Sequence, residues 1–247
     1  MAGHSKWANI KFRKGLQDAK RGKIFTKLIR EISVSARMGG GDEAANSRLR
    51  DAVSKALKAN MKRDTIDNAI KRGIGGLDGV NMIEMRYEGY GPGGVAIIVD
   101  CLSDNKNRTV SEVRHAFTKH GGNLGTDGSV SYLFNEQGEI LLAPTDREEQ
   151  AMDLAIEACA TDVTTEDGQM EIITTADTYH AILAVLQASN FEVEHSHVTM
   201  RARLMVPMDK DTTESLEKLI DALEDLDDVQ VVYSNSEFSE HSIESVE

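Results

Sequence analysis

The spacing of apolar residues changes at Gly75 and Gly76, and this change constrains the fold more than any other feature of the chain. Before this point, apolar residues recur every three or four positions, which is typical of amphipathic helices. After it, short β-rich runs alternate with helical patterns and glycine-rich turns. The sequence therefore predicts a multidomain α+β protein rather than a purely helical or purely β one.

The segment before Gly75 predicts a bundle of three helices. The first is expected over residues 17–38, where six apolar positions share an arc of about 140° and a run of three glycines follows. The second lies near residues 48–62. The third is expected to begin at Asp64 as its N-cap and to end at Gly73. Short connections between these helices favour a small bundle.

The segment after Gly76 predicts two α/β sandwich domains. The first should contain strands at 83–87, 95–102 and 130–134, a helix at 106–120, and a returning part made of 204–207, a helix from 211 and a strand at 229–233. Residues 139–198 follow the order strand, helix, two strands, helix, strand, which is that of a ferredoxin-like domain. We therefore expect three domains: 1–78, then 79–135 together with 204–247, and an inserted ferredoxin-like domain at 136–203.

Charge is distributed very unevenly along the chain. The whole protein has a formal net charge of −13, but residues 1–75 hold 18 Lys and Arg against 7 Asp and Glu, a net of +11. The remaining residues hold 10 basic against 34 acidic side chains, a net of −24. Because charges beyond about 8 Å are largely screened at physiological salt, the local patch decides binding. The basic segment is therefore expected to attract a phosphate-rich partner.

The cations of this segment fall opposite the apolar faces of the predicted helices, as expected of surfaces that contact backbone phosphates. The predicted nucleic-acid-binding residues are Lys20, Lys23, Lys27 and Arg30 on the first helix, Arg48, Lys55, Lys58 and Lys62 on the second, and Lys6, Trp7, Lys11, Arg13 and Lys14 in an N-terminal arm. Trp7 either stacks on an unpaired base or anchors the arm on the bundle.

A second, smaller basic cluster lies in the acidic part of the chain. The polar loop 103–109 runs into a predicted helix N-terminus, where backbone amides can bind phosphate. A secondary contact with nucleic acid is therefore a hypothesis of equal weight with a capped loop carrying solvated charges. The residues of this secondary contact are Lys106, Arg108, Arg114 and Lys119.

No motif in the sequence indicates catalysis, a metal or a cofactor. The glycines at 89, 91 and 94 fit G-x-G-x-x-G, but a strand follows them where a dinucleotide site needs a helix. His195 and His197 could face one side of a strand, yet no third metal ligand is nearby. The two cysteines, Cys101 and Cys159, lie 58 positions apart without the paired spacing of a zinc ribbon or of a disulfide framework.

Several segments resemble the YebC/PmpR family closely. They are MAGHSKWANI at 1–10, KIFTKLIREI at 23–32, GGGD at 39–42, YEGYGPGG at 87–94, DNKNRT at 104–109, and GGNLG at 121–125 followed by GSV at 128–130. The resemblance covers essentially the whole chain. It implies a cytoplasmic bacterial protein with a helical bundle and two α/β domains, without known catalytic activity, whose family role is that of a probable DNA-binding transcriptional regulator. The basic N-terminal residues could also suggest a removable mitochondrial transit peptide, but the resemblance begins at Met1 and therefore argues against that interpretation.

The kind of nucleic acid stays open at this point. The predicted helices lack the Asn, Gln and Arg clusters that read bases in a major groove, which favours recognition of shape and backbone, as in structured RNA. A translation factor that binds ribosomal RNA is therefore the alternative to a DNA-binding regulator, and the resemblance to the YebC/PmpR family implies that such a factor would act on stalled ribosomes or as a translational activator. A protein adaptor that acts through the acidic domains is the third hypothesis. We expect a monomer without a cofactor. We also expect no membrane partner, because no apolar run approaches the roughly 20 residues of a spanning helix.

Overall fold

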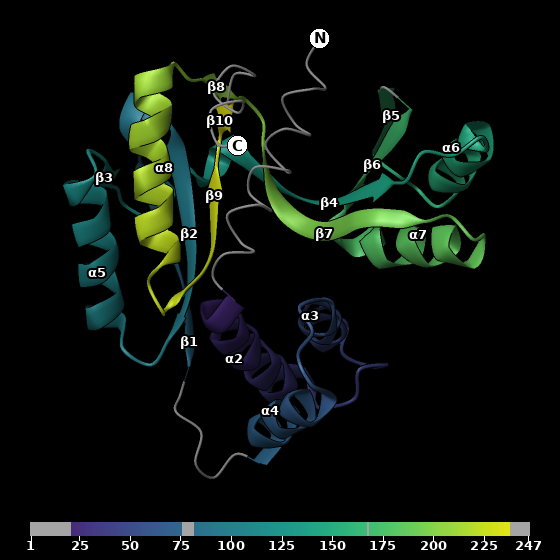
Figure 1. The fold of residues 1–247 in the computed structure, drawn as a ribbon, viewed down its shortest axis with the longest axis horizontal. Coiled ribbons are helices and arrows are strands. Elements are labelled where there is room, and N and C mark those ends of the chain that lie inside the picture. The colour runs from purple at the N-terminus through teal and green to yellow at the C-terminus, as the bar shows by residue number, and fades with distance from the viewer. Residues whose placement is uncertain (1–20, 76–81, 167, 238–247) are drawn as a thin grey trace. The chain divides into compact units, whose positions relative to one another are not determined.

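The protein is described here by a computed structural model covering residues 21–75, 82–166 and 168–237, with Arg21 and Gly22 described for their backbone only (Figure 1). It divides into two compact units, Met1–Val130 with Val206–Glu247, and Ser131–Met205. A helical region comes first and sheet-containing parts follow, which confirms the predicted α+β class. The finer division into three domains stays a prediction.

The helical region of the first unit consists of α2 (Arg21–Gly39), α3 (Ser47–Lys58) and α4 (Arg63–Gly75). Their apolar faces share one core, in which Ile32, Leu49 and Ile66 are fully buried. Helices α2 and α4 cross closely at Gly73, where an added Cβ would lie 2.3 Å from the carbonyl oxygen of Ser33. This close approach explains why a glycine stands inside the last turns of α4.

The same unit contains a four-stranded antiparallel sheet in the order β3-β1-β2-β9. Its elements are β1 (Ile83–Tyr90), η1 (Pro92–Gly94), β2 (Ala96–Ser103), α5 (Lys106–Lys119), β3 (Asn123–Leu124), α8 (Lys210–Glu224) and β9 (Val229–Ser234). Alternate residues of the central strand β2, such as Ile97 and Val99, pack against Phe117 of α5 and Leu219 of α8. Both helices therefore share one core with one face of this sheet.

Two segments that were expected in this sheet lie elsewhere in the structure. Residues 130–142, expected to hold one strand at 130–134 and a second that begins at residue 139, contain a short 3-10 helix, η2 (Ser131–Leu133), followed by one uninterrupted strand, β4 (Phe134–Leu142), of the second unit. The polar run at 135–137 suggests a turn, but its side chains alternate between more and less buried positions, as in a strand with one covered face. The residues at 204–207 also do not join the large sheet, since β8 (Val206–Pro207) pairs in parallel with β10 (Ser236–Glu237).

The second unit has the strand order β5-β6-β4-β7 in a fully antiparallel sheet. Its further elements are α6 (Glu148–Glu157), β5 (Asp162–Glu166), β6 (Gln169–Thr175), α7 (Ala176–Ala188) and β7 (Val193–Ala202). This connectivity and order are those of a ferredoxin-like domain. Its core contains Ile140, Ile172 and Ile182, separate from that of the first unit.

The two cysteines have opposite environments. Cys101 lies on β2 and is buried, and this burial, together with the nearby Asp100 and Asp228 carboxylates, raises the pKa of its thiol to about 12. Cys159 follows α6 and is exposed. Both thiols are free, so neither contributes a covalent crosslink to the fold.

Candidate nucleic-acid interface

The structure divides the predicted nucleic-acid-binding residues into three groups. The first lies outside the described residues and comprises Lys6, Trp7, Lys11, Arg13, Lys14 and Lys20. The second is engaged within the protein and comprises Lys23, Lys27, Arg30 and Arg48. The third is exposed and comprises Lys55, Lys58 and Lys62.

Lys23, Lys27 and Arg30, here called the α2 cation row, contact the C-terminal end of α8 and the turn that follows it. The Nζ of Lys23 lies 3.0 Å from the carbonyl oxygen of Asp225 and 3.3 Å from its Oδ1. The Nζ of Lys27 donates to the carbonyl oxygen of Glu224 at 2.8 Å. Arg30 donates from Nη1 to the carbonyl oxygen of Asp227 at 2.5 Å. The row is therefore occupied by groups of the same chain.

The end of α8 accepts these cations because it is strongly electronegative. The last carbonyls of a helix lack intrahelical partners and carry the negative end of the helix dipole. No basic residue stands in the last turn of α8 to offset this charge. Burial lowers the pKa of Lys27, and the charge of Lys23 acts in the same direction, while Glu224, Asp225 and Asp227 oppose the shift. The α2 cation row supplies the charge that α8 itself lacks.

Arg48 is held by two carboxylates. Its Nε lies 2.7 Å from the Oε1 of Glu31 on α2, and its Nη2 pairs with Glu84 of β1. Burial by itself would lower the pKa of Arg48, but the hydrogen bonds and charges of Glu31 and Glu84 raise it. Arg48 therefore stays charged while it links the bundle to the first sheet.

Lys55, Lys58 and Lys62, here called the α3 cation row, are exposed and have no hydrogen bond or ion pair within the described part of the chain. Lys55 and Lys58 lie on α3 away from its buried face, which is formed by Leu49, Ala52, Val53 and Ala56, whereas Lys62, expected on the same helix, stands in the connection between α3 and α4. A sharp turn follows α3, with Asn60 in the left-handed region at φ 62°. These three lysines can therefore approach a polyanion without first losing an internal contact.

Helix α4 adds two cations that the sequence-based prediction omitted. Lys71 and Arg72 are both exposed, and neither has a hydrogen bond or ion pair among residues 21–75, 82–166 and 168–237. The signal was present in the sequence, since both residues fall outside the apolar positions Ile66, Ala69 and Ile70 of the same helix.

The predicted secondary contact is split by the structure. Lys106, Arg114 and Lys119, here called the α5 cation set, are exposed on α5. Arg108 instead binds the carboxylate of Asp228, with its Nη2 lying 2.9 Å from Oδ2 and its Nε 3.1 Å from the same atom. Arg108 is therefore engaged within the protein, unlike the other three, and its contact with nucleic acid stays a prediction.

Asp228 is the centre of a buried polar cluster. Only 2% of this residue is exposed, and its carboxylate also accepts hydrogen bonds from the hydroxyls of Ser103 at 2.8 Å and Thr109 at 2.9 Å. Arg30 of α2 approaches its Oδ1 at 3.3 Å. Burial alone would raise the pKa of Asp228, but the hydrogen bonds from Arg108, Ser103 and Thr109 and the charge of Arg108 hold it below its usual value.

This cluster explains the polar run at 103–109. Asn105 is the N-cap of α5, and its side chain accepts from the backbone N–H of Arg108 at 3.1 Å. The backbone N–H of Asn105 itself donates to the Ser103 hydroxyl at 3.1 Å. The polar side chains of this loop thus cap α5 and hold Asp228, in line with the capped-loop hypothesis.

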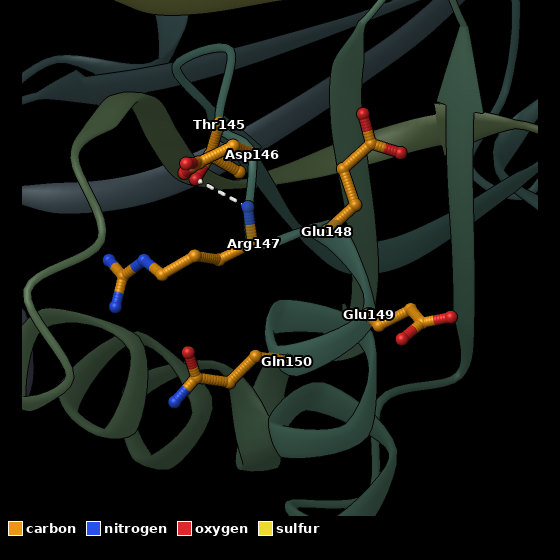
Figure 2. A pocket seen from close by; sticks show the side chains of 6 residues that line it. All are labelled: Thr145, Asp146, Arg147, Glu148, Glu149 and Gln150. Carbon is orange, nitrogen blue, oxygen red and sulfur yellow. Dashed lines mark hydrogen bonds between the residues drawn. The ribbon is translucent and has the colours of Figure 1, made fainter.

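A pocket in the second unit offers no further site. It is lined by Thr145, Asp146, Arg147, Glu148, Glu149 and Gln150 at the start of α6. Figure 2 shows the side chains of Glu148 and Glu149 pointing away from those of Arg147 and Gln150. The Arg147 guanidinium already binds the carbonyl oxygens of Ser189 and Asn190 and lies over the ring of Phe191. The pocket therefore does not gather its polar groups around one ligand position.

The remaining sequence motifs also have structural explanations. Gly89 lies on β1, and residues 91–94 (Gly-Pro-Gly-Gly) form the turn between β1 and β2, where Gly93 and Gly94 have positive φ angles of 72° and 73°. His195 and His197 lie side by side on β7, with ring centroids 4.5 Å apart, and the Nε2 of His197 is 3.8 Å from Glu139. Among the described residues no group of three or more potential ligands could hold a metal ion.

Comparison with known proteins identifies the family. A model of the TACO1/YebC protein N-terminal domain matches residues 5–76, and a model of the TACO1/YebC second and third domain matches residues 82–236. The chain therefore belongs to the TACO1/YebC family, which confirms the resemblance found in its sequence motifs.

Individual relatives align over the full length. A probable transcriptional regulatory protein from Legionella pneumophila is 74% identical over 246 residues, covering 100% of both chains. A protein with the same description from Francisella tularensis is 57% identical over 247 residues, again covering 100% of both. The crystal structure of a conserved hypothetical protein from Aquifex aeolicus has a TM-score of 0.78 at 45% identity and covers 90% of this chain and 93% of that one. Within the described residues, no helix has the length and apolar character needed to cross a bilayer.

Proposed function

We propose that this chain is a non-enzymatic regulator of gene expression that binds nucleic acid through its helical region. The observation that carries the proposal is the α3 cation row, three exposed lysines that have no partner among the described residues, on a segment with a net charge of +11. The names of the Legionella and Francisella relatives support the regulatory part of the proposal. The separation of this charge from the acidic remainder supports a polyanionic partner.

Binding would depend mainly on the phosphate backbone. Lysine presents a compact point charge that suits phosphate but does not read base edges in the bidentate way of arginine. Each phosphate that is neutralised releases condensed counterions, so affinity falls with rising salt. If about five phosphates are engaged, by the α3 cation row and the N-terminal arm, log K should fall against log salt with a slope of roughly −3.5 to −4.5.

Structured RNA is the second candidate for the bound polymer. A surface of lysines recognises the position of phosphates rather than a sequence, and this suits folded RNA as well as duplex DNA. The corresponding function is that of a translation factor that binds ribosomal RNA. A comparison of a short duplex DNA with a short RNA hairpin, at equal salt, distinguishes the two forms of the proposal.

The test compares two variants with the same change in net charge. The first replaces the α3 cation row (Lys55→Ala, Lys58→Ala, Lys62→Ala), and the second replaces the α5 cation set (Lys106→Ala, Arg114→Ala, Lys119→Ala). Filter-binding titrations over a range of salt should show a slope shallower by roughly 2 to 3 for the first variant, because three phosphate contacts are lost. The second variant should keep the slope of the unmodified protein.

Two outcomes would contradict the proposal. A slope near zero for the unmodified protein, on both duplex DNA and RNA hairpin, would remove nucleic-acid binding altogether. A larger loss in the α5 variant than in the α3 variant would transfer the interface from the helical region to the first sheet unit. Pulldown after nuclease treatment addresses the adaptor hypothesis, since an adaptor keeps its protein partners when nucleic acid is digested.

A further inference from the structure

The end of α8 presents negative groups to the α2 cation row over a length that a nucleic-acid strand would also span. The row extends over the eight residues 23–30 of α2, or about 10 Å along the helix axis. Over that length, one strand of DNA carries about three phosphates. Each of the three cations meets a separate carbonyl oxygen, from Glu224, Asp225 and Asp227. The end of α8 thus occupies the row as a short polyanion would.

The sequence of this segment is more acidic than its own fold requires. Residues 221–228 contain five acidic side chains and no basic one. Carboxylates at a helix C-terminus are unfavourable because they face the negative end of the dipole. Of the five, Asp228 has a clear role in the core of the first unit, where it holds Arg108, Ser103 and Thr109. Asp225 and Asp227 are exposed, so burial in the core does not account for them.

We propose that Lys23, Lys27 and Arg30 form a second phosphate-binding row that the end of α8 occupies in this structure, so that nucleic acid and α8 compete for the same three side chains. The inference rests on the proposed function and adds an autoinhibitory contact to it. Residues 224–227 are the internal competitor, and the phosphodiester backbone is the ligand that displaces it.

The contact has the properties that exchange requires. The side chains of Lys23 and Asp225 are 46% and 45% exposed, so water and salt reach their ion pair. Arg48 and Glu84, which also join the bundle to the first sheet, are 38% and 50% exposed. Exposed pairs of this kind are weak and are screened by ions. A polyanion can therefore replace these exposed pairs, while the part-buried bond of Lys27 to Glu224 and the pair of Arg30 with the buried Asp228 must be exchanged for bonds to phosphate oxygens.

A zero-length crosslink measures the contact directly in the unmodified protein. A carbodiimide joins an amine to a carboxylate only when the two groups touch, as the Lys23 amine and the Asp225 carboxylate do at 3.3 Å. Lys218 and Glu214, 2.7 Å apart within α8, provide an internal reference. Saturation with duplex DNA or RNA hairpin should lower the yield of the first crosslink at least twofold, as measured by peptide mass spectrometry. The second should not change.

A pair of variants with equal charge change tests the competition by affinity. The first neutralises the end of α8 (Glu224→Gln, Asp225→Asn, Asp227→Asn) and leaves the buried Asp228 in place. The control neutralises three exposed carboxylates of α6 (Glu149→Gln, Asp153→Asn, Glu157→Gln). If one molecule in about ten has the row free, the first variant should bind up to roughly tenfold more tightly. Its salt slope should also be steeper than that of the control.

The outcomes separate this inference from the proposed function. Absence of any salt-dependent binding overturns both. Binding that leaves the yield of the Lys23–Asp225 crosslink unchanged overturns only the competition. An equal change in affinity in the α8 and α6 variants also overturns only the competition. Binding that lowers the crosslink and responds to the α8 variant alone supports it.

Discussion

At the scale of single residues, Asp228 shows how much of this protein depends on one buried carboxylate. It joins β9 to the start of α5 through Arg108 and Thr109, and it is reached by Arg30 from the helical bundle. A buried charge is tolerated only when it is paired and hydrogen-bonded, and this one has several donors. Its replacement should therefore affect the whole first unit.

The variant Asp228→Asn tests this role. We expect it to lower the free energy of unfolding by about 3 kcal/mol, because the buried side chain at position 228 loses the charge that pairs with the Arg108 and Arg30 guanidinium groups. Urea unfolding followed by circular dichroism provides the measurement. Asp227→Asn, one position away and exposed, is the control and should change stability by less than about 0.5 kcal/mol. Equal effects in the two variants would contradict the assignment.

The same carboxyl group predicts a dependence on pH. Its pKa in the folded protein lies below the ordinary value of 3.8. As the pH falls below 3.8, the unfolded chain therefore takes up a proton before the folded chain does, and stability decreases. The contribution is fully present above pH 3.8 and is lost as the pH falls through the lower, folded-state pKa. The stability difference between the unmodified protein and Asp228→Asn should narrow in that acid range. A stability difference between the two proteins that stays constant over this pH range would contradict the lowered pKa of Asp228.

At the scale of elements, the crossing of α2 and α4 is fixed by the absence of a side chain at Gly73. A Cβ at this position would lie 2.3 Å from the Ser33 carbonyl oxygen and 2.8 Å from the Cβ of Ala36. Neither neighbour is the flexible end of a long side chain. The two helices must therefore separate to accommodate any substitution.

Gly73→Ala should consequently destabilise the bundle by about 1 to 3 kcal/mol, the range typical of overpacking. Gly75→Ala, two residues further along the same helix, is the matched control. A Cβ there meets nothing within 4 Å, so the change should be neutral or slightly stabilising through helix propensity. Thermal unfolding of both variants gives the comparison, and equal midpoints would show that the crossing adapts freely.

The elements also show what sequence patterns reveal and what they miss. Helical periodicity located α2, α3 and α4, and the βαββαβ order located the ferredoxin-like unit, because these signals are local. The strand β4 was divided in two, since a polar run inside a half-exposed strand resembles a turn. The strands β8 and β10 pair across about 30 positions of sequence, and neither two-residue segment has a local pattern that predicts this pairing.

The sequence predicts which helix faces carry the cations of the candidate interface, but not which of these cations have partners within the protein. Spacing alone placed Lys23, Lys27 and Lys58 opposite apolar stripes, and all three do lie away from the fully buried core. The partners of the first two lie 197 to 202 positions further along the chain, in α8 and the turn after it. Helix periodicity carries no information about such distant contacts. The number of cations that are free to bind could therefore not be counted from sequence.

At the scale of the whole molecule, the two units differ sharply in charge. Residues 131–205 contain 3 Lys and Arg against 14 Asp and Glu, a net of −11. This unit also has its own apolar core, with Ile140 and Ile182 fully buried. It should therefore fold independently and be repelled by nucleic acid.

Expression of residues 131–205 alone tests this division. We expect cooperative thermal unfolding, because the four strands and two helices close one core within a continuous segment. We also expect no retention by duplex DNA or RNA hairpin at any salt concentration. Non-cooperative melting would show that this unit needs contacts from the rest of the chain, and salt-dependent retention would locate part of the interface in the acidic half.

The contrast between the two thiols makes the natural protein ready for site-specific attachment of a probe. Burial and a high pKa protect Cys101 from thiol-reactive dyes, whereas Cys159 is exposed after α6. One fluorophore per native molecule should therefore attach, in the ferredoxin-like unit and far along the sequence from the basic helices. Tumbling of that unit during complex formation can then be followed by fluorescence anisotropy without engineering a single cysteine.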